Sequence, residues 1–281
     1  MIGKKGEEGM GTLVAIILVA VTAIILFSFS GELFAKGKSA SDIEACRLSV
    51  IAQSKTKIAG RTSVSLKCPR REIVFFNNKV EINGKKSSGY DFKHLSRDIV
   101  NMVLAEELRL CWYRMGEGKE EVFGEDLILD FNIVCSICSD IKFDKEVVES
   151  GRGVATFSDL IPYLKSKKLS DSKTQGISLW DYFTKIEGFA QFENYAVVLS
   201  LEKGFVNPVD LIKQGLKAEE IETMVPEFFE SSFSPEKSYS VYYEGLKSSS
   251  LAQITGVESV YATGILENRK VAEKCKNNIA N

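Results

Sequence analysis

The sequence has a single histidine among its 281 residues, and this scarcity limits the catalytic chemistry that it could support. A Ser-His-Asp or Cys-His arrangement would have to use His94, and no recognisable motif surrounds that residue. The phosphate-binding pattern Gly-x-x-x-x-Gly-Lys-Ser/Thr is missing as well. We therefore expect a protein that is not an enzyme, with no catalytic residues and no cofactor.

An excess of basic residues is also lacking, because 36 Lys and Arg stand against 38 Asp and Glu, for a formal net charge of −2. This balance argues against nucleic acid as a partner. No Asn-x-Ser/Thr acceptor occurs, which excludes N-glycosylation at the usual signal. A composition that is 44% hydrophobic and 26% charged is typical of a folded chain and not of a disordered one.

Charged residues are missing altogether between Gly9 and Gly31, and here the absence is informative. About 20 apolar residues at 1.5 Å each reach about 30 Å, the thickness of the hydrocarbon part of a bilayer. A core helix of a soluble domain would carry a polar stripe at a period of about 3.6 residues, but only Thr22 and Ser28 interrupt residues 13–29. The run therefore predicts a single transmembrane helix.

The flanks of the run predict its orientation. Lys4 and Lys5 precede it and favour a cytoplasmic amino terminus, with the bulk of the chain outside the cell. A secretory signal peptide is the main alternative, because Ser28-Phe29-Ser30 has the small-x-small pattern of a cleavage site. The apolar region of such a signal is about 7 to 15 residues long, and the longer run here favours an anchor.

The residues in front of the run are Lys-Lys-Gly-Glu-Glu-Gly-Met-Gly-Thr-Leu-Val, at positions 4–14. They resemble the start of archaellins and archaeal type IV pilin-like proteins. The class III signal of that family is a basic stub ending in Lys-Gly or Arg-Gly, followed by Gly-x-Gly-Thr-Leu and a long apolar helix. The resemblance implies that a prepilin-type peptidase recognises Lys5 and Gly6 and cuts before Glu7, so that the helix stays in the mature protein. Glu8 departs from the small or apolar residue usual at its position.

This resemblance implies three parts: a leader stub at 1–6, a transmembrane or assembly helix at 7–31, and an extracytoplasmic domain at 32–281. Helices in lipid associate through close packing of small residues. Gly9, Gly11 and Ala15 offer such a surface. The helix could accordingly bundle with its copies in a homo-oligomeric filament, or act as a plain anchor in the membrane.

Six cysteines follow the apolar run, at positions 46, 68, 111, 135, 138 and 275. An even number of cysteines in an exported domain indicates disulfide bonds, although sequence alone cannot select the pairing. The helix that ends near Cys111 is expected to pack against the strand that leads to Cys135. We therefore favour a bond from Cys111 to Cys135 or Cys138.

The pair Cys135-Ser-Ile-Cys138 also has the spacing of half a zinc site or of a redox couple. A zinc site would need Cys46 and Cys68 as the other two ligands, because no second Cys-x-x-Cys pair exists. No strand-to-helix redox context surrounds the motif. Structural disulfides remain the favoured interpretation, with Cys135 at the end of a strand and directed into a core.

Hydrophobic periodicity in the rest of the chain predicts a mixed α+β domain. We expect helices over 41–55 and 91–115, and strands over 73–76, 79–82, 127–135, 195–201, 238–243 and 257–262. Gly116 is expected to end the second helix. The charged side of that helix, which includes Glu106 and Glu107, is expected to face water. The carboxylates after the helix are also expected to face water: Glu117, Glu120, Glu121, Glu125 and Asp126.

The turn Gly116-Glu117-Gly118-Lys119, with the later Cys-x-x-Cys, resembles uncharacterised exported proteins of small-genome archaea and implies no activity. We expect a membrane-anchored cell-surface protein that acts as a pilin-like structural or adhesive component. The alternatives are an anchored extracytoplasmic binding module that does not polymerise and an anchored enzyme or metal-binding domain.

Overall fold

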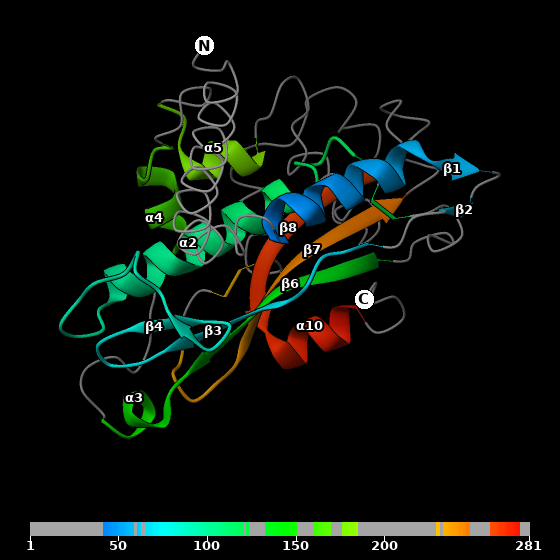
Figure 1. Cartoon of the computed structure of the whole chain (residues 1–281). Helices are drawn as coiled ribbons and strands as arrows, with labels where there is room; N and C mark the ends of the chain where they lie inside the picture. Colours follow the sequence, from blue (N-terminus) through cyan, green and yellow to red (C-terminus); the bar gives the residue numbers. More distant parts are fainter. Residues whose placement is uncertain are drawn as a thin grey trace, which may run out of the picture. The chain divides into compact units, whose positions relative to one another are not determined.

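A computed structural model (Figure 1) describes residues 42–58, 61–62, 66–120, 122–123, 133–150, 160–169, 176–184, 229–230, 233–247 and 259–275. The chain divides into two compact units, Met1–Glu44 and Ala45–Asn281. Almost all described residues belong to the second unit, to which the following description applies. The expected apolar helix and the expected strand over 195–201 lie outside the described residues.

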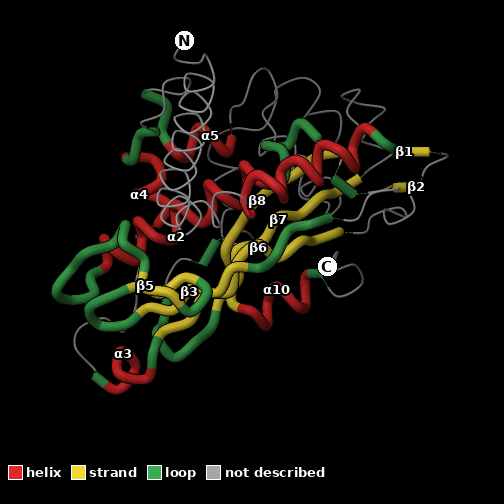
Figure 2. The backbone as a smooth tube through the Cα atoms, in the orientation of Figure 1, coloured by secondary structure: helices red, strands yellow, loops and turns green. Residues whose placement is uncertain are grey.

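Six strands form one mixed sheet in the order β5-β4-β3-β6-β7-β8 (Figure 2). Their bounds are Arg71–Phe75 (β3), Val80–Ile82 (β4), Lys85–Lys86 (β5), Ile133–Phe143 (β6), Tyr239–Lys247 (β7) and Ser259–Glu267 (β8). Neighbouring strands are antiparallel except β3 and β6, which run parallel. Two short strands, β1 (Lys57–Ile58) and β2 (Arg61–Thr62), form a separate antiparallel pair.

Helices cover both faces of this sheet, as Figure 1 shows for α2 on one side and α10 on the other. The helical elements are residues 42–55, α2 (Arg97–Arg114), α3 (Lys145–Glu149), α4 (Leu160–Ser166), α5 (Leu179–Thr184) and α10 (Asn268–Lys274). The predicted mixed α+β class is therefore confirmed.

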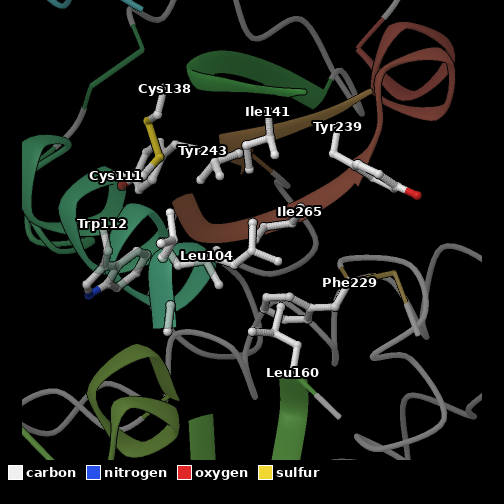
Figure 3. Packing of buried hydrophobic residues seen from close by; sticks show 14 of the residues in the cluster. Leu104, Cys111, Trp112, Cys138, Ile141, Leu160, Phe229, Tyr239, Tyr243 and Ile265 are labelled. Atoms are coloured by element: carbon white, nitrogen blue, oxygen red, sulfur yellow. A yellow bond between two sulfur atoms is a disulfide. The ribbon is translucent and has the colours of Figure 1, made fainter. Parts of the chain in front are cut away.

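The main core lies on the α2 side of the sheet, where Figure 3 shows Leu104 and Trp112 of α2 among buried side chains from the strands. Tyr243 of β7 stacks on Tyr261 of β8 with ring centroids 5.5 Å apart. A smaller cluster occupies the α10 side and consists of Cys135, Tyr242, Leu266, Val271 and Cys275. Two separate apolar clusters explain why a long central strand such as β6 is buried on both faces.

A β-bulge at Cys138 changes which residues of β6 face α2. Ile137 pairs with Tyr242 and Ser139 with the next residue, Val241, so that Cys138 is the extra residue. Cys138 and Ser139 consequently both contact α2, through a disulfide and a hydrogen bond respectively. Cys135 instead bonds Cys275, at the end of α10. The two cysteines of the Cys-x-x-Cys motif therefore fasten helices to opposite faces of one strand.

Most predicted elements in the described part of the chain are confirmed. The first helix ends at 55 as expected, and the hairpin of β3 and β4 is followed by a turn with positive φ at Asn83 and Gly84. The second helix begins later than predicted, because Ser96 caps it through a hydrogen bond with Ile99. His94 accordingly lies before the helix and is exposed.

The strand predicted over 127–135 was ended too early. Within the described residues β6 spans Ile133–Phe143, while residues 124–132, where most of the predicted strand falls, lie outside the described part. The Cys-x-x-Cys motif therefore lies within the strand and not at its end. The bulge explains the error, because it interrupts the alternation of buried and exposed residues from which strands are recognised.

Candidate functional site

Helix 42–55 is the first described element after the amino-terminal segment, and one of its faces is fastened to the domain. Its buried residues Cys46, Ser49, Val50 and Gln53 follow helical spacing. Cys46 forms a disulfide with Cys68, with the two Cα atoms 4.5 Å apart. We call the residues that fasten this helix, Cys46, Arg47, Ser54, Cys68, Glu117 and Glu120, the attachment site.

The turn after α2 has an unusual backbone that positions two of these residues. Gly116, Glu117 and Gly118 have consecutive φ angles of +83°, +59° and +71°. For a residue other than glycine, the left-handed region costs about 1–2 kcal/mol. Gly116 ends α2 as predicted, and a Cβ there would lie 2.7 Å from Cγ of Glu120. The cost at Glu117 suggests that its side-chain contacts hold it in this conformation.

Glu117 joins three segments of the chain through its carboxylate. Arg47 of helix 42–55 donates a hydrogen bond from Nη2 to Oε2 of Glu117 at 2.9 Å, and the Tyr182 hydroxyl of α5 donates to Oε1 at 2.6 Å. The Arg47 guanidinium also donates to the Tyr113 carbonyl and lies 4.0 Å from the centroid of the Tyr113 ring. The side chains of Arg47 and Glu117 are only 21% and 17% exposed.

These contacts change the protonation behaviour of both partners. Burial alone raises the pKa of Glu117, but the hydrogen bonds from Tyr182 and Arg47 and the positive charge of Arg47 outweigh it and bring the pKa below its usual range. Burial, and then the hydrogen bond to the Glu117 carboxylate, raise the pKa of Tyr182. Around neutral pH the site therefore holds a carboxylate between a guanidinium and a protonated phenol.

Glu120 makes a second connection to the same helix. The Ser54 hydroxyl donates a hydrogen bond to Oε2 of Glu120, and Nζ of Lys55 lies 3.5 Å from that oxygen. The expectation that Glu117 and Glu120 face water was wrong, because helix 42–55 covers both carboxylates. The other three carboxylates of the predicted group, Glu121, Glu125 and Asp126, lie outside the described residues.

A buried polar network lies beside Cys68, the second cysteine of the Cys46–Cys68 disulfide. Arg71, at the start of β3, donates to Oε1 of Glu107 at 3.0 Å, and the Ser139 hydroxyl of β6 donates to Oε2 at 2.7 Å. Arg114 donates to the carbonyl of Pro69, directly after Cys68, at 2.7 Å. Glu107 is 1% exposed, so its expected place on the water-facing side of the helix was wrong. The arginine and the hydroxyl supply the hydrogen bonds that a buried carboxylate requires.

The α10 side of the sheet has its own fastening. Cys135 bonds Cys275, and Nζ of Lys274 lies 2.9 Å from Oε1 of Glu244, a fully buried carboxylate on β7. This ion pair holds α10 beside β7, and the Cys135–Cys275 disulfide holds the end of α10 beside β6.

The six cysteines thus form three disulfides, Cys46–Cys68, Cys111–Cys138 and Cys135–Cys275. The predicted disulfide-bonded domain and the favoured partner of Cys111 are confirmed, the latter as Cys138. The four cysteines considered as zinc ligands are distributed over all three bonds. Within the described part of the chain, no group of three or more His, Cys, Asp or Glu side chains is arranged to hold a metal ion.

The predicted processing and helix-packing residues lie outside the described residues: Lys5, Gly6, Glu7, Gly9, Gly11 and Ala15. Of the helices in the described ranges, none has the length and hydropathy needed to span a bilayer. A scan against protein-family models and searches of curated proteins and solved structures found no match.

Sequence reasoning did not identify Arg47, Arg71, Glu107 and Glu117 as members of a site. The glycines on both sides of Glu117 were the one available signal, because two nearby glycines after a helix permit consecutive left-handed residues. No comparable signal marks Glu107, whose partners come from two strands distant in the sequence. The side chains of the attachment site bind one another, an arrangement suited to fastening a segment.

Proposed function

We propose that this chain is a membrane-anchored cell-surface protein, with a cytoplasmic amino terminus and an extracellular domain, that acts as a pilin-like structural or adhesive component. In this proposal residues 1–6 are a leader removed by a prepilin-type peptidase. Residues 7–31 are the membrane-spanning and assembly helix, and residues 32–281 form the domain outside the cell. The partners are the membrane and other copies of the chain.

The observation that supports export is the complete pairing of the cysteines. All six take part in disulfides, and none is left free. Disulfides persist in oxidising compartments and are rare in the cytosol. The cysteines lie on the carboxyl-terminal side of the apolar run, which the positive-inside rule assigns to the exterior. The pairing and the charge pattern therefore support the same topology independently.

A second candidate function is an anchored extracytoplasmic binding module that does not polymerise. The observation that favours it is the six-stranded mixed sheet with helices on both faces. This architecture is larger and more mixed than the compact β-rich domain of archaellins, to which the amino terminus has a resemblance. The filament and the module share the anchor and differ in whether the helices assemble.

Amino-terminal sequencing of the mature protein tests the proposal. A first residue of Glu7 supports pilin-type processing, and an intact Met1 supports a plain anchor. A start near Gly31 would contradict anchoring, since the apolar run would have been discarded.

Negative-stain microscopy then separates the filament from the module. We expect filaments that are lost in Gly9→Leu and Gly11→Leu, because a larger side chain prevents close helix packing. Ile17→Leu is the matched control, since it keeps an apolar side chain of the same size, and it should leave filaments intact. Absence of filaments from the unmodified protein would favour the module.

A further inference from the structure

We propose that the Cys46–Cys68 disulfide is a mechanical clamp, through which tension on the amino-terminal segment passes directly into the central sheet. The biological use of such a clamp depends on the proposed function, in which the chain is held at its amino terminus. The mechanical property itself belongs to the folded domain and can be measured separately.

The position of Cys46 is the first argument. It is the second residue after the boundary between the two compact units, which lies between Glu44 and Ala45. The fastenings of helix 42–55 from Arg47 to Glu117 and from Ser54 to Glu120 are noncovalent and come later along the helix than Cys46. Without the disulfide, tension would reach these contacts one after another and peel the helix from its start.

The surroundings of Cys68 are the second argument. The carbonyl of the next residue, Pro69, accepts a hydrogen bond from the buried Arg114 of α2. Two residues further, Arg71 begins β3 and binds Glu107, which also binds Ser139 of β6. Load that leaves Cys46 through the disulfide therefore enters a segment fixed to both α2 and β6.

The sheet register is the third argument. β3 lies between β4 and β6, and five consecutive residue pairs, Arg71↔Ser139 to Phe75↔Phe143, join it to β6. β6 in turn carries Cys135 and Cys138, which fasten it to Cys275 and to Cys111. Force along β3 is thus shared by these five residue pairs at once and is transmitted to β6, which carries two disulfides. The part of helix 42–55 after Cys46 and the β1–β2 pair lie within the loop that the clamp bypasses.

The length of that loop gives the size of the expected signal. The two cysteines are 22 residues apart in the sequence, while their Cα atoms are 4.5 Å apart. An extended chain spans at most about 3.3–3.6 Å per residue, so opening this bond releases roughly 75 Å of chain. The clamp predicts that this length becomes available under tension only when the bond is absent.

Single-molecule force spectroscopy on the full chain in detergent tests the clamp, with handles at the two termini. In Cys46→Ala/Cys68→Ala we expect an early extension of roughly 75 Å at low force, before the main rupture of the domain. The oxidised unmodified protein should lack this step. The matched control is Cys111→Ala/Cys138→Ala, which opens a loop of similar size, 27 residues. Its additional length should appear only after the sheet has ruptured.

A second measurement requires no amino-acid substitution. Cys68 is partly exposed, while the other five cysteines are buried. A dithiol reductant should therefore open Cys46–Cys68 first: it forms its own disulfide as the protein bond becomes two thiols, which alkylation locates. The folded, partly reduced protein should show the same early step.

The proposal is overturned if the Cys46→Ala/Cys68→Ala variant and the partly reduced protein both rupture at the same force as the oxidised unmodified protein, with no earlier extension. Noncovalent contacts would then be sufficient to hold helix 42–55 under tension. Terminal sequencing addresses the other question. A discarded apolar run would contradict anchoring while leaving the mechanical result intact, so the two failures are distinguishable.

Discussion

Replacing Glu117 by glutamine removes one charge from the centre of the attachment site while retaining the shape of the side chain. Hydrogen bonds to charged groups contribute about 1.5–3 kcal/mol net, compared with about 1 kcal/mol for neutral pairs. Arg47 and Glu117 are about one fifth exposed, which reduces the difference through solvent screening. We expect Glu117→Gln to lower the free energy of unfolding by about 1–2 kcal/mol at pH 7.

The pH dependence makes this prediction specific. Because the folded pKa of Glu117 lies below its ordinary value of 4.5, its stabilisation is fully present above that pH and is lost as the pH falls through the folded pKa. Glu117→Gln has no such proton to gain. The difference in stability between the two proteins should therefore shrink steadily as the medium is acidified below pH 4.5.

The assay is denaturant unfolding of the full chain in mild detergent, followed by the fluorescence of its two tryptophans, Trp112 and Trp180. Glu106→Gln is the matched control, because Glu106 forms a more exposed pair with Arg109 on α2. It should change stability by less than about 0.5 kcal/mol. A loss of stability in Glu117→Gln no larger than in this control, or one that is undiminished in acid, would contradict a stabilising charge at Glu117.

Two further predictions concern the supports of the attachment site. Gly116→Ala should destabilise the protein by more than Gly84→Ala when unfolding midpoints are compared. Both residues have positive φ, but a Cβ at Gly116 would lie 2.7 Å from the Glu120 side chain, whereas a Cβ at Gly84 would have no neighbouring atom within 4 Å. Equal effects of the two substitutions would contradict the close contact at Gly116. Glu107→Leu should lower the free energy of unfolding by about 3–5 kcal/mol, because it removes the carboxylate that binds the buried Arg71. The double variant with Arg71→Met should recover much of this stability. A loss below about 1 kcal/mol in the single variant would contradict the buried network.

How much the sequence could predict depended on whether the relevant interactions were local. Helix 42–55, the β3–β4 hairpin and the end of α2 at Gly116 follow from capping, periodicity and turn residues a few positions apart. These signals are local and were interpreted correctly. The later start of α2 has an equally local cause in Ser96, but the apolar pattern before that residue concealed it.

The candidate site depended on contacts between distant parts of the chain. Glu107 was assigned to water because an isolated amphipathic helix places its charged residues there, but Arg71 and Ser139 are 36 and 32 residues away in the sequence. The bulge at Cys138 likewise brings Ser139 to the same face as Cys138, so that both residues contact α2. Such details depend on how strands pair, which hydrophobic periodicity does not specify.

The proposed location requires a domain whose six cysteines are all paired in an oxidising exterior. The most direct test is the mass of the chain extracted from membranes and alkylated under denaturing conditions without reduction. We predict no added alkyl group, and six after reduction, with peptides linked as Cys46–Cys68, Cys111–Cys138 and Cys135–Cys275. Six alkylated cysteines before reduction, in a chain recovered from the cytosol, would contradict both the disulfide framework and the proposed location.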